Sequence, residues 1–143
     1  MNQKPKITLS LLLVGLILLA ASCNSGQKSK KPESPEKTAK RLTEQVADEW
    51  LRFDGGYVLD IKGFNADSTL DVAYYNPRSI NIARTQWKVD GGQLFFYVLF
   101  DDEGYRGSYY SLGYFPNDDR ISGYYYLAGE QQEYEVYFER KNL

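Results

Sequence analysis

The spacing of hydrophobic residues changes near residue 50, and this change separates two kinds of expected structure. Before it, apolar side chains recur every three or four residues, which is typical of one face of a helix: Ala39, Leu42, Val46 and Trp50. Ser34 and Pro35 match the N-cap and first-turn preferences of helices. We therefore expect a short helix over residues 35–48 with one face against the following domain; a frayed polar linker is the alternative.

From Trp50 to the C-terminus, apolar and polar positions alternate, which is typical of β-strands. Turn-forming residues such as Asn76-Pro77 and Asp90-Gly91-Gly92 separate the alternating segments. Connections this short join antiparallel neighbours, because a parallel crossover needs about a dozen residues or more. The expected strands are 50–53 continuing through a Gly-Gly kink into 57–63, then 69–75, 79–88, 93–101, 106–115, 120–128 and 131–140.

These segments predict an all-β domain, an antiparallel up-and-down meander of seven to eight strands preceded by the short helix. We expect a closed small barrel, because closure leaves no exposed strand edges; an open or sandwich-like sheet is the alternative. Such a barrel has an interior just wide enough for side chains or one small ligand. The segment Gln93–Phe100 is apolar on both faces, so the helix is expected to cover its outer side.

The first residues of the chain have the pattern of an export signal. Lys4 and Lys6 give a positive start, Ile7–Ala21 is almost entirely apolar, and Ser22 leads to Cys23. The apolar run is shorter than the roughly 18 residues expected of a membrane-spanning helix. The pattern therefore predicts export rather than a transmembrane span.

Residues Ala20-Ala21-Ser22-Cys23 resemble the lipobox of bacterial lipoproteins, which reads Leu, two small residues and Cys; Ala20 replaces the Leu here. The resemblance implies that Cys23 receives a diacylglyceryl group and becomes the mature N-terminus. Lipidation at Cys23 would anchor the chain in the cell membrane or outer membrane, with its domain on the periplasmic or extracellular side. A plain secretory signal with a coincidental cysteine, and an uncleaved anchor, are the alternatives.

The expected organisation is a signal peptide (1–22), a flexible basic tether (23–34), a lead-in helix (35–48) and a β-barrel domain (49–143). Residues 24–41 carry six basic and two acidic residues, whereas residues 42–143 carry nine basic and seventeen acidic residues. The acidic domain repels phosphate backbones, so no nucleic-acid partner is expected. The basic tether suits anionic lipid headgroups, although lysines also simply keep a linker solvated.

Composition narrows the chemistry further. The chain has 13 Tyr, 7 Phe and 2 Trp but no His, and Cys23 is its one cysteine. Aromatic side chains suit the pleated surface of a sheet. The lack of histidine removes the commonest neutral-pH acid/base and metal ligand, and one cysteine permits no intramolecular disulfide. We expect no cofactor, no metal and no enzymatic activity.

A short helix, a tryptophan at the start of the first strand and an up-and-down meander resemble the layout of lipocalins and avidins across residues 40–143. The resemblance implies a ligand-binding barrel. The lipocalin Gly-x-Trp motif is replaced by Asp48-Glu49-Trp50, and only Trp50 and Trp87 are present to compare with an avidin pocket. No ligand residue is therefore carried over from either group.

Two features of the strands suggest binding. Alternation from Ile80 and Ile82 turns Arg84 inward, where a guanidinium can bind an anionic group bidentately; a bulge that turns Arg84 out and Trp87 in is the alternative. Tyrosines can line a sugar- or aromatic-binding surface or form cross-strand ladders that only stabilise the sheet. The tyrosines considered are Tyr74, Tyr75, Tyr109, Tyr110, Tyr124, Tyr125 and Tyr126.

Carboxylates cluster in two turns, Asp101-Asp102-Glu103 and Asp118-Asp119, but neither matches a calcium-binding loop and both suit ordinary turns. We expect a non-enzymatic barrel that binds a small molecule or an envelope protein partner. The alternatives are a structural or assembly lipoprotein with a packed barrel and, last, an envelope hydrolase that uses these carboxylates. The candidate ligand-binding residues are Asn76, Arg84, Trp87, Tyr109 and Gln132.

Overall fold

The computed structural model describes residues 33–142. The expected signal peptide (1–22), Cys23 and nearly all of the expected tether lie outside the described residues. Helix α1 spans Pro35–Val46, with the Ser34 Oγ accepting a hydrogen bond from the Lys37 backbone N–H and proline in the first turn. Across residues 33–142, no helix has the length and apolar character needed to cross a bilayer.

The domain is all-β after this helix, which confirms the predicted fold class. Nine strands form one antiparallel sheet, one strand more than the upper limit expected from the sequence. The strands are β1 Asp48–Arg52, β2 Val58–Phe64, β3 Leu70–Asn76, β4 Arg78–Ile80, β5 Ile82–Asp90, β6 Gln93–Phe100, β7 Tyr109–Phe115, β8 Arg120–Leu127 and β9 Gln132–Arg140.

Two strand predictions were wrong in detail. Residues 50–53 and 57–63 do not form one kinked strand, because β1 and β2 pair with each other as an antiparallel hairpin around Gly55 and Gly56. Residues 79–88 also do not form one strand, because the chain breaks at Asn81 between β4 and β5. At Asn81 the alternation continues across the break, from buried Ile80 to half-buried Ile82, which hides it from a sequence pattern.

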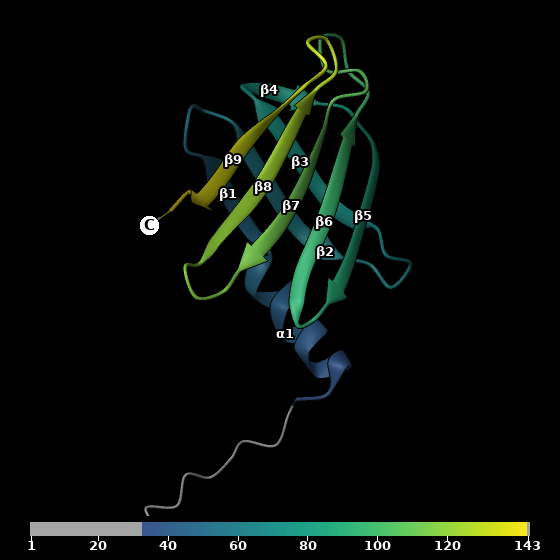
Figure 1. Cartoon of the computed structure of the whole chain (residues 1–143), viewed down its shortest axis with the longest axis vertical. Coiled ribbons are helices and arrows are strands. Elements are labelled where there is room, and N and C mark those ends of the chain that lie inside the picture. The colour runs from purple at the N-terminus through teal and green to yellow at the C-terminus, as the bar shows by residue number, and fades with distance from the viewer. Residues whose placement is uncertain (1–32, 143) are drawn as a thin grey trace, which may run out of the picture. The chain divides into compact units, whose positions relative to one another are not determined.

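The sheet curls into a nearly closed barrel (Figure 1). Its strand order is β4-β3-β2-β1-β9-β8-β7-β6-β5, so the first and last strands of the chain are neighbours. The pairing of β1 with β9 sets Trp50 opposite Arg140 and Arg52 opposite Phe138. Because β4 and β5 are the two ends of this order, the barrel closes at a seam beside them.

The seam is held by a side chain instead of a full ladder of backbone hydrogen bonds. Thr85 of β5 accepts a hydrogen bond from the Leu70 backbone N–H at 2.8 Å and donates one to the Leu70 carbonyl at 3.2 Å. One backbone bond, from the Trp87 N–H to the Ser68 carbonyl at 2.9 Å, lies next to it. At this position the Thr85 side chain therefore supplies the hydrogen bonds that the backbone of a paired strand would supply.

Helix α1 closes one end of the barrel, at the lower end in Figure 1. Leu42 and Val46 are fully buried in the same apolar cluster as the inward-facing strand residues, and the Trp50 indole N–H donates to the Val46 carbonyl at 2.8 Å. The expectation that the helix covers the outer side of Gln93–Phe100 was wrong. The narrow apolar stripe of the helix packs into the barrel end. Phe95 and Tyr97 of β6 are left half-buried on the outer surface.

Replacing Leu42 with alanine tests how firmly the helix docks. We expect Leu42→Ala to lower the free energy of unfolding by about 2–5 kcal/mol, because it removes a fully buried side chain from the plugged end. Urea denaturation followed by tryptophan fluorescence measures this change. Lys40→Ala, on the exposed face of the same helix, should change it by less than about 0.5 kcal/mol. Equal small effects of both substitutions would show that the helix does not support the barrel.

Candidate functional site

The barrel end opposite α1 holds a polar pocket, which we call the mouth pocket. It lies where β1, β3 and β8 end and where the 101–108 loop crosses the rim. Its volume is about 260 Å³, which suits a small molecule or a few waters rather than a large ligand. Its lining comprises Arg52, Tyr57, Tyr74, Asn76, Gly104, Tyr105, Tyr125 and Leu127.

Arg52 is the central polar group of this pocket. Its side chain points into the barrel from the end of β1 and is 7% exposed. Asp54 binds it with two oxygens, at 2.6 Å from Nε and 3.1 Å from Nη2, and the Nη1 atom donates to the Tyr110 hydroxyl at 2.7 Å. The Tyr57 ring lies over the guanidinium, with its centroid 3.7 Å from the Arg52 Cζ.

Tyrosine hydroxyls extend this network into the barrel. The Tyr74 and Tyr110 hydroxyls are 3.0 Å apart and hydrogen-bonded, and both rings are buried. Burial raises the pKa of Tyr74 and of Tyr110 well above the usual tyrosine range, so both hydroxyls stay protonated near neutral pH. At the rim, the Asn76 side-chain amide donates a hydrogen bond to the Tyr105 hydroxyl.

The mouth pocket offers hydrogen-bond donors to a ligand. A guanidinium has five N–H groups, and the contacts above use three of those of Arg52. Two N–H groups of Arg52 therefore have no hydrogen-bond acceptor within residues 33–142, and Asn76 and Tyr105 line the same pocket. This arrangement can bind a small polar molecule with an acidic or planar acceptor group.

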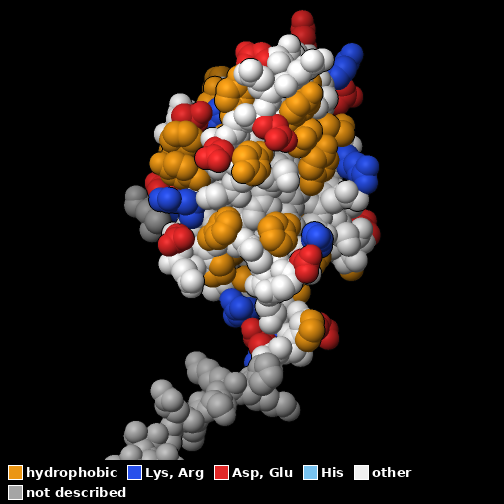
Figure 2. All heavy atoms as spheres, in the orientation of Figure 1, with side chains coloured by type: hydrophobic (Ala, Val, Ile, Leu, Met, Phe, Trp, Pro, Cys, Tyr) orange, Lys and Arg blue, Asp and Glu red, His pale blue; other side chains and the backbone are white. Residues whose placement is uncertain are grey.

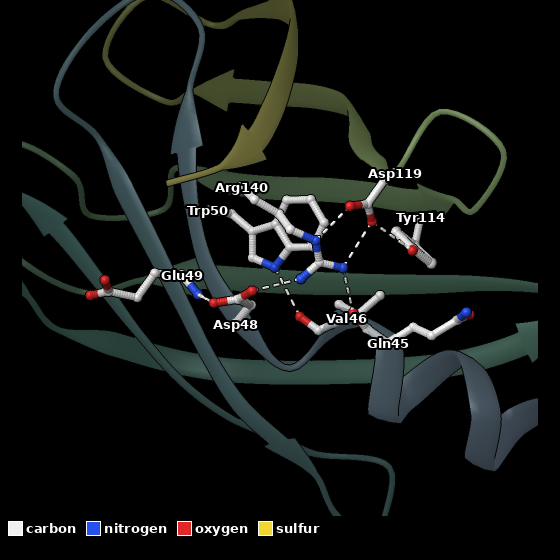
Figure 3. Close-up of polar contacts among 8 residues, drawn as sticks. All are labelled: Gln45, Val46, Asp48, Glu49, Trp50, Tyr114, Asp119 and Arg140. Atoms are coloured by element: carbon white, nitrogen blue, oxygen red, sulfur yellow. Dashed lines mark hydrogen bonds and ion pairs between the residues drawn. The ribbon is translucent and has the colours of Figure 1, made fainter. Parts of the chain in front are cut away.

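A second arginine, Arg140, occupies the opposite end of the barrel, next to α1 (Figure 3). Asp119 binds it bidentately, at 2.6 Å from Nε and 2.8 Å from Nη2. Its Nη1 donates to Asp48 at 2.7 Å, and its Nη2 also donates to the Gln45 carbonyl at 2.7 Å. The Trp50 ring lies 4.5 Å from its Cζ, so this arginine of β9 ties the helix end to β1 and to the turn that holds Asp119.

The two arginines differ in the number of N–H groups that they leave free to bind a ligand. Arg140 directs four N–H groups to protein acceptors around a plugged barrel end, and its surroundings include buried Trp50. Arg52 directs three and lines an open pocket. We therefore assign Arg140 to the stability of the fold and Arg52 to the candidate binding site.

The structure places only one of the five candidate residues in the mouth pocket, and this residue is Asn76. The inward orientation expected for Arg84 was wrong, because the β5–β6 register shifts between Ile82 and Arg84. This bulge leaves Arg84 exposed on the outside and turns Trp87 inward, as the alternative interpretation of the same segment proposed.

The other three candidates lie apart from the pocket. Trp87 packs edge-on against Phe64 near the seam, and its indole N–H donates to the Asn65 carbonyl. Tyr109 is on the outer face of β7, and Gln132 is exposed at the start of β9, where it contacts the Tyr134 hydroxyl. The expected common site therefore does not form.

Arg52 was not among the candidates, although one signal pointed to it. Alternation from Trp50 turns Arg52 to the same side of β1, but a strand of five residues has only three other positions from which to judge the alternation. Tyr105 lies in a loop, so no periodicity predicts where its hydroxyl points. Both residues reach the pocket through strand order, which the sequence does not reveal.

Three of the five turn carboxylates form ion pairs. Asp101 pairs with Arg106 at 3.0 Å, Asp102 with Arg78 at 3.2 Å, and Asp119 with Arg140. Over residues 33–142, no group of three or more His, Cys, Asp or Glu side chains is arranged to hold a metal ion.

Comparison with protein families, curated proteins and solved structures finds no match for this chain.

Replacing Asp119 with asparagine tests the Arg140 cluster through its pH dependence. The hydrogen bond from Arg140 lowers the pKa of Asp119, so the ionised carboxylate stabilises the fold above its ordinary pKa of 3.8. We expect Asp119→Asn to lower the free energy of unfolding by about 1 kcal/mol at pH 7, a modest value because this side chain is 41% exposed. The difference should shrink as the pH falls through the lowered pKa.

Urea denaturation at pH 7 and at pH 3 measures both effects. Asn keeps the tolerance for the positive φ of 44° at this turn position, so the change removes charge without straining the backbone. Asp118→Asn, at the exposed neighbouring position, is the matched control and should have little effect at either pH. A wild-type advantage that stays constant between the two pH values would contradict the ion pair.

Proposed function

We propose that this protein is a lipid-anchored envelope protein whose barrel binds a small molecule at the mouth pocket without catalysing a reaction. The observation that carries the proposal is the buried guanidinium of Arg52, with two N–H groups left over, at the open end of the barrel. A buried charge is costly unless it is paired, and Asp54 pairs with Arg52. The N–H groups of Arg52 that this pairing does not use can donate hydrogen bonds to an acceptor group on a ligand.

The pocket's position within the domain supports this proposal. The described chain enters at the N-terminus of α1, and the mouth pocket lies at the other end of the barrel (Figure 1). A tether that leads from Cys23 into α1 therefore attaches at the end away from the pocket.

The ligand we propose is small and polar, with a carboxylate or similar acidic group. The rest of the barrel interior is filled by apolar and aromatic side chains such as Phe100, Tyr110 and Phe138, so the pocket is shallow. Its lining residues include no Asp or Glu, the nearby Asp54 carboxylate is already bound to Arg52, and Tyr74 and Tyr125 have raised pKa values because of burial. These groups suit binding better than proton transfer at neutral pH.

The packed interior also favours a second candidate function, that of a structural or assembly lipoprotein acting through its outer surface. Nineteen buried hydrophobic side chains form one cluster that runs from α1 to the mouth. In this case the hydrogen-bond network of Arg52 serves only to pair the polar groups at the open barrel end and binds no ligand. Detection of a bound ligand separates the two functions.

Lipidation is tested by metabolic labelling with a fatty-acid probe in a bacterial host that processes lipoproteins. We expect the wild-type chain to incorporate the probe and to fractionate with membranes. Cys23→Ser should abolish labelling and release the protein into the soluble envelope fraction, because the thiol is the acceptor of the lipid. Membrane retention of Cys23→Ser at the wild-type level would contradict the anchor.

Ligand binding is tested by native mass spectrometry of the full chain carrying Cys23→Ser, purified from its host. We expect an additional bound mass, and we expect Asn76→Ala to weaken its binding about threefold to tenfold, the worth of one hydrogen bond. Gln132→Ala is the control, because this residue was a candidate that the structure places outside the pocket. The absence of any bound mass, or equal losses in the two variants, would favour the assembly function.

A further inference from the structure

The outer faces of β6 to β9 carry many aromatic side chains. Figure 2 shows them as separate apolar patches with polar and acidic groups between them, on the side of the barrel that faces the viewer. Adjacent tyrosines point to opposite sides of a strand, so Tyr124 and Tyr126 of β8 lie outside while Tyr125 is buried. The outer rings fall into two groups with different surroundings.

Rings in the first group cover one another. Tyr109 stacks on Tyr126 with centroids 5.0 Å apart, and Tyr97 lies 5.1 Å from Tyr109 on its other side. Further down the barrel, Phe53 stacks on Tyr137 at 4.3 Å, and the Arg120 Cζ lies 4.5 Å from the Tyr137 ring. These ring faces are occupied, so this group forms the stabilising ladders expected of a sheet surface.

Tyr124 and Phe115 behave differently. Tyr124 is 47% exposed and Phe115 41% exposed, and neither ring stacks on another aromatic ring within residues 33–142. They line a groove of about 490 Å³, together with Phe53 and Tyr137 of the first group and with Ser122, Gly123, Glu135 and Val136. Their free faces are therefore available at the sides of a preformed hollow.

The strand register gives the size of this groove. Tyr124 is paired with Ser111 of β7, and Phe115 lies four residues further along the same strand. At about 3.3 Å per residue, the two rings are separated by about 13 Å along the strand direction. The groove is thus long enough for a short chain of rings, and its lining residues come from β7, β8, β9 and the turn between β1 and β2.

Polar groups lie next to the free rings. Glu135 of β9 is paired with Tyr124 in the sheet, lines the groove and is exposed, and its carboxylate has no hydrogen-bond or ion-pair partner within residues 33–142. Ser122 also lines the groove and adds a hydroxyl. An unpaired carboxylate is a pure acceptor, and a hydroxyl is both donor and acceptor.

We propose that this groove binds a neutral glycan chain. A sugar ring presents an apolar C–H face that packs on an aromatic ring, and its hydroxyls donate to a carboxylate, which is the combination that Tyr124 and Glu135 supply. The acidic residues of β9, Glu133, Glu135 and Glu139, disfavour an anionic chain. A protein partner would match one continuous apolar patch better than rings separated by polar groups.

The proposal does not depend on the proposed function of the mouth pocket, because the groove and that pocket share no lining residue. Its test is isothermal titration calorimetry of the full chain carrying Cys23→Ser. The probes are neutral tetrasaccharides of glucose, xylose, mannose and N-acetylglucosamine. We expect at least one of them to bind, and we expect Tyr124→Ala to weaken that binding at least tenfold.

The matched control is Tyr126→Ala on the same strand, because its ring face is covered by Tyr109. It should leave binding within twofold of wild type. Glu135→Gln should weaken binding several-fold, whereas Glu133→Gln, whose carboxylate accepts from the Tyr109 hydroxyl, should not. Binding of none of the tetrasaccharides at millimolar concentration, or equal effects of Tyr124→Ala and Tyr126→Ala, would overturn the proposal.

Discussion

The pairing of the first strand with the last in a single register is the constraint on which the rest of the structure depends. It sets Trp50 opposite Arg140 at the helix end and Arg52 opposite Phe138 toward the mouth. Because side chains alternate along a strand, a slip of one residue would turn Trp50 and Arg52 outward together. The plug at one end of the barrel and the pocket at the other therefore follow from one set of backbone contacts between distant parts of the chain.

The barrel solves the problem of its two open ends differently. At one end, α1 supplies Leu42 and Val46 to the apolar interior, and Arg140 joins the helix end to the strands through acceptors of the protein itself. At the other end no helix is present in the described structure, and Arg52 with its tyrosine network fills the space instead. A polar end is costly to bury and easy to hydrate, which is why we place the candidate binding site there rather than beside the helix.

The tyrosine-rich composition serves three purposes at once. Tyr74 and Tyr110 bury their rings in the core, while the Tyr110 hydroxyl accepts a hydrogen bond from Arg52 and is hydrogen-bonded to the Tyr74 hydroxyl. Tyr109 and Tyr126 cover each other outside and stiffen the sheet, and Tyr124 keeps a free face beside a groove. The residue type is the same in each case, so the role depends on which side of the strand each ring occupies and on what lies across from it.

The sequence by itself determined the elements. Ser34-Pro35 and the spacing of Leu42, Val46 and Trp50 predict the helix, and alternation with turns such as Asp90-Gly91-Gly92 predicts the strands and their antiparallel meander, because both signals come from contacts between near neighbours in the chain. The tertiary structure alone decided that α1 plugs the barrel instead of covering β6, that a bulge turns Arg84 out, and that Arg52 is the buried arginine beside Asn76 and Tyr105. These outcomes depend on strand order and register between residues as distant as Arg52 and Phe138, and such contacts leave no periodic trace in the sequence of either partner.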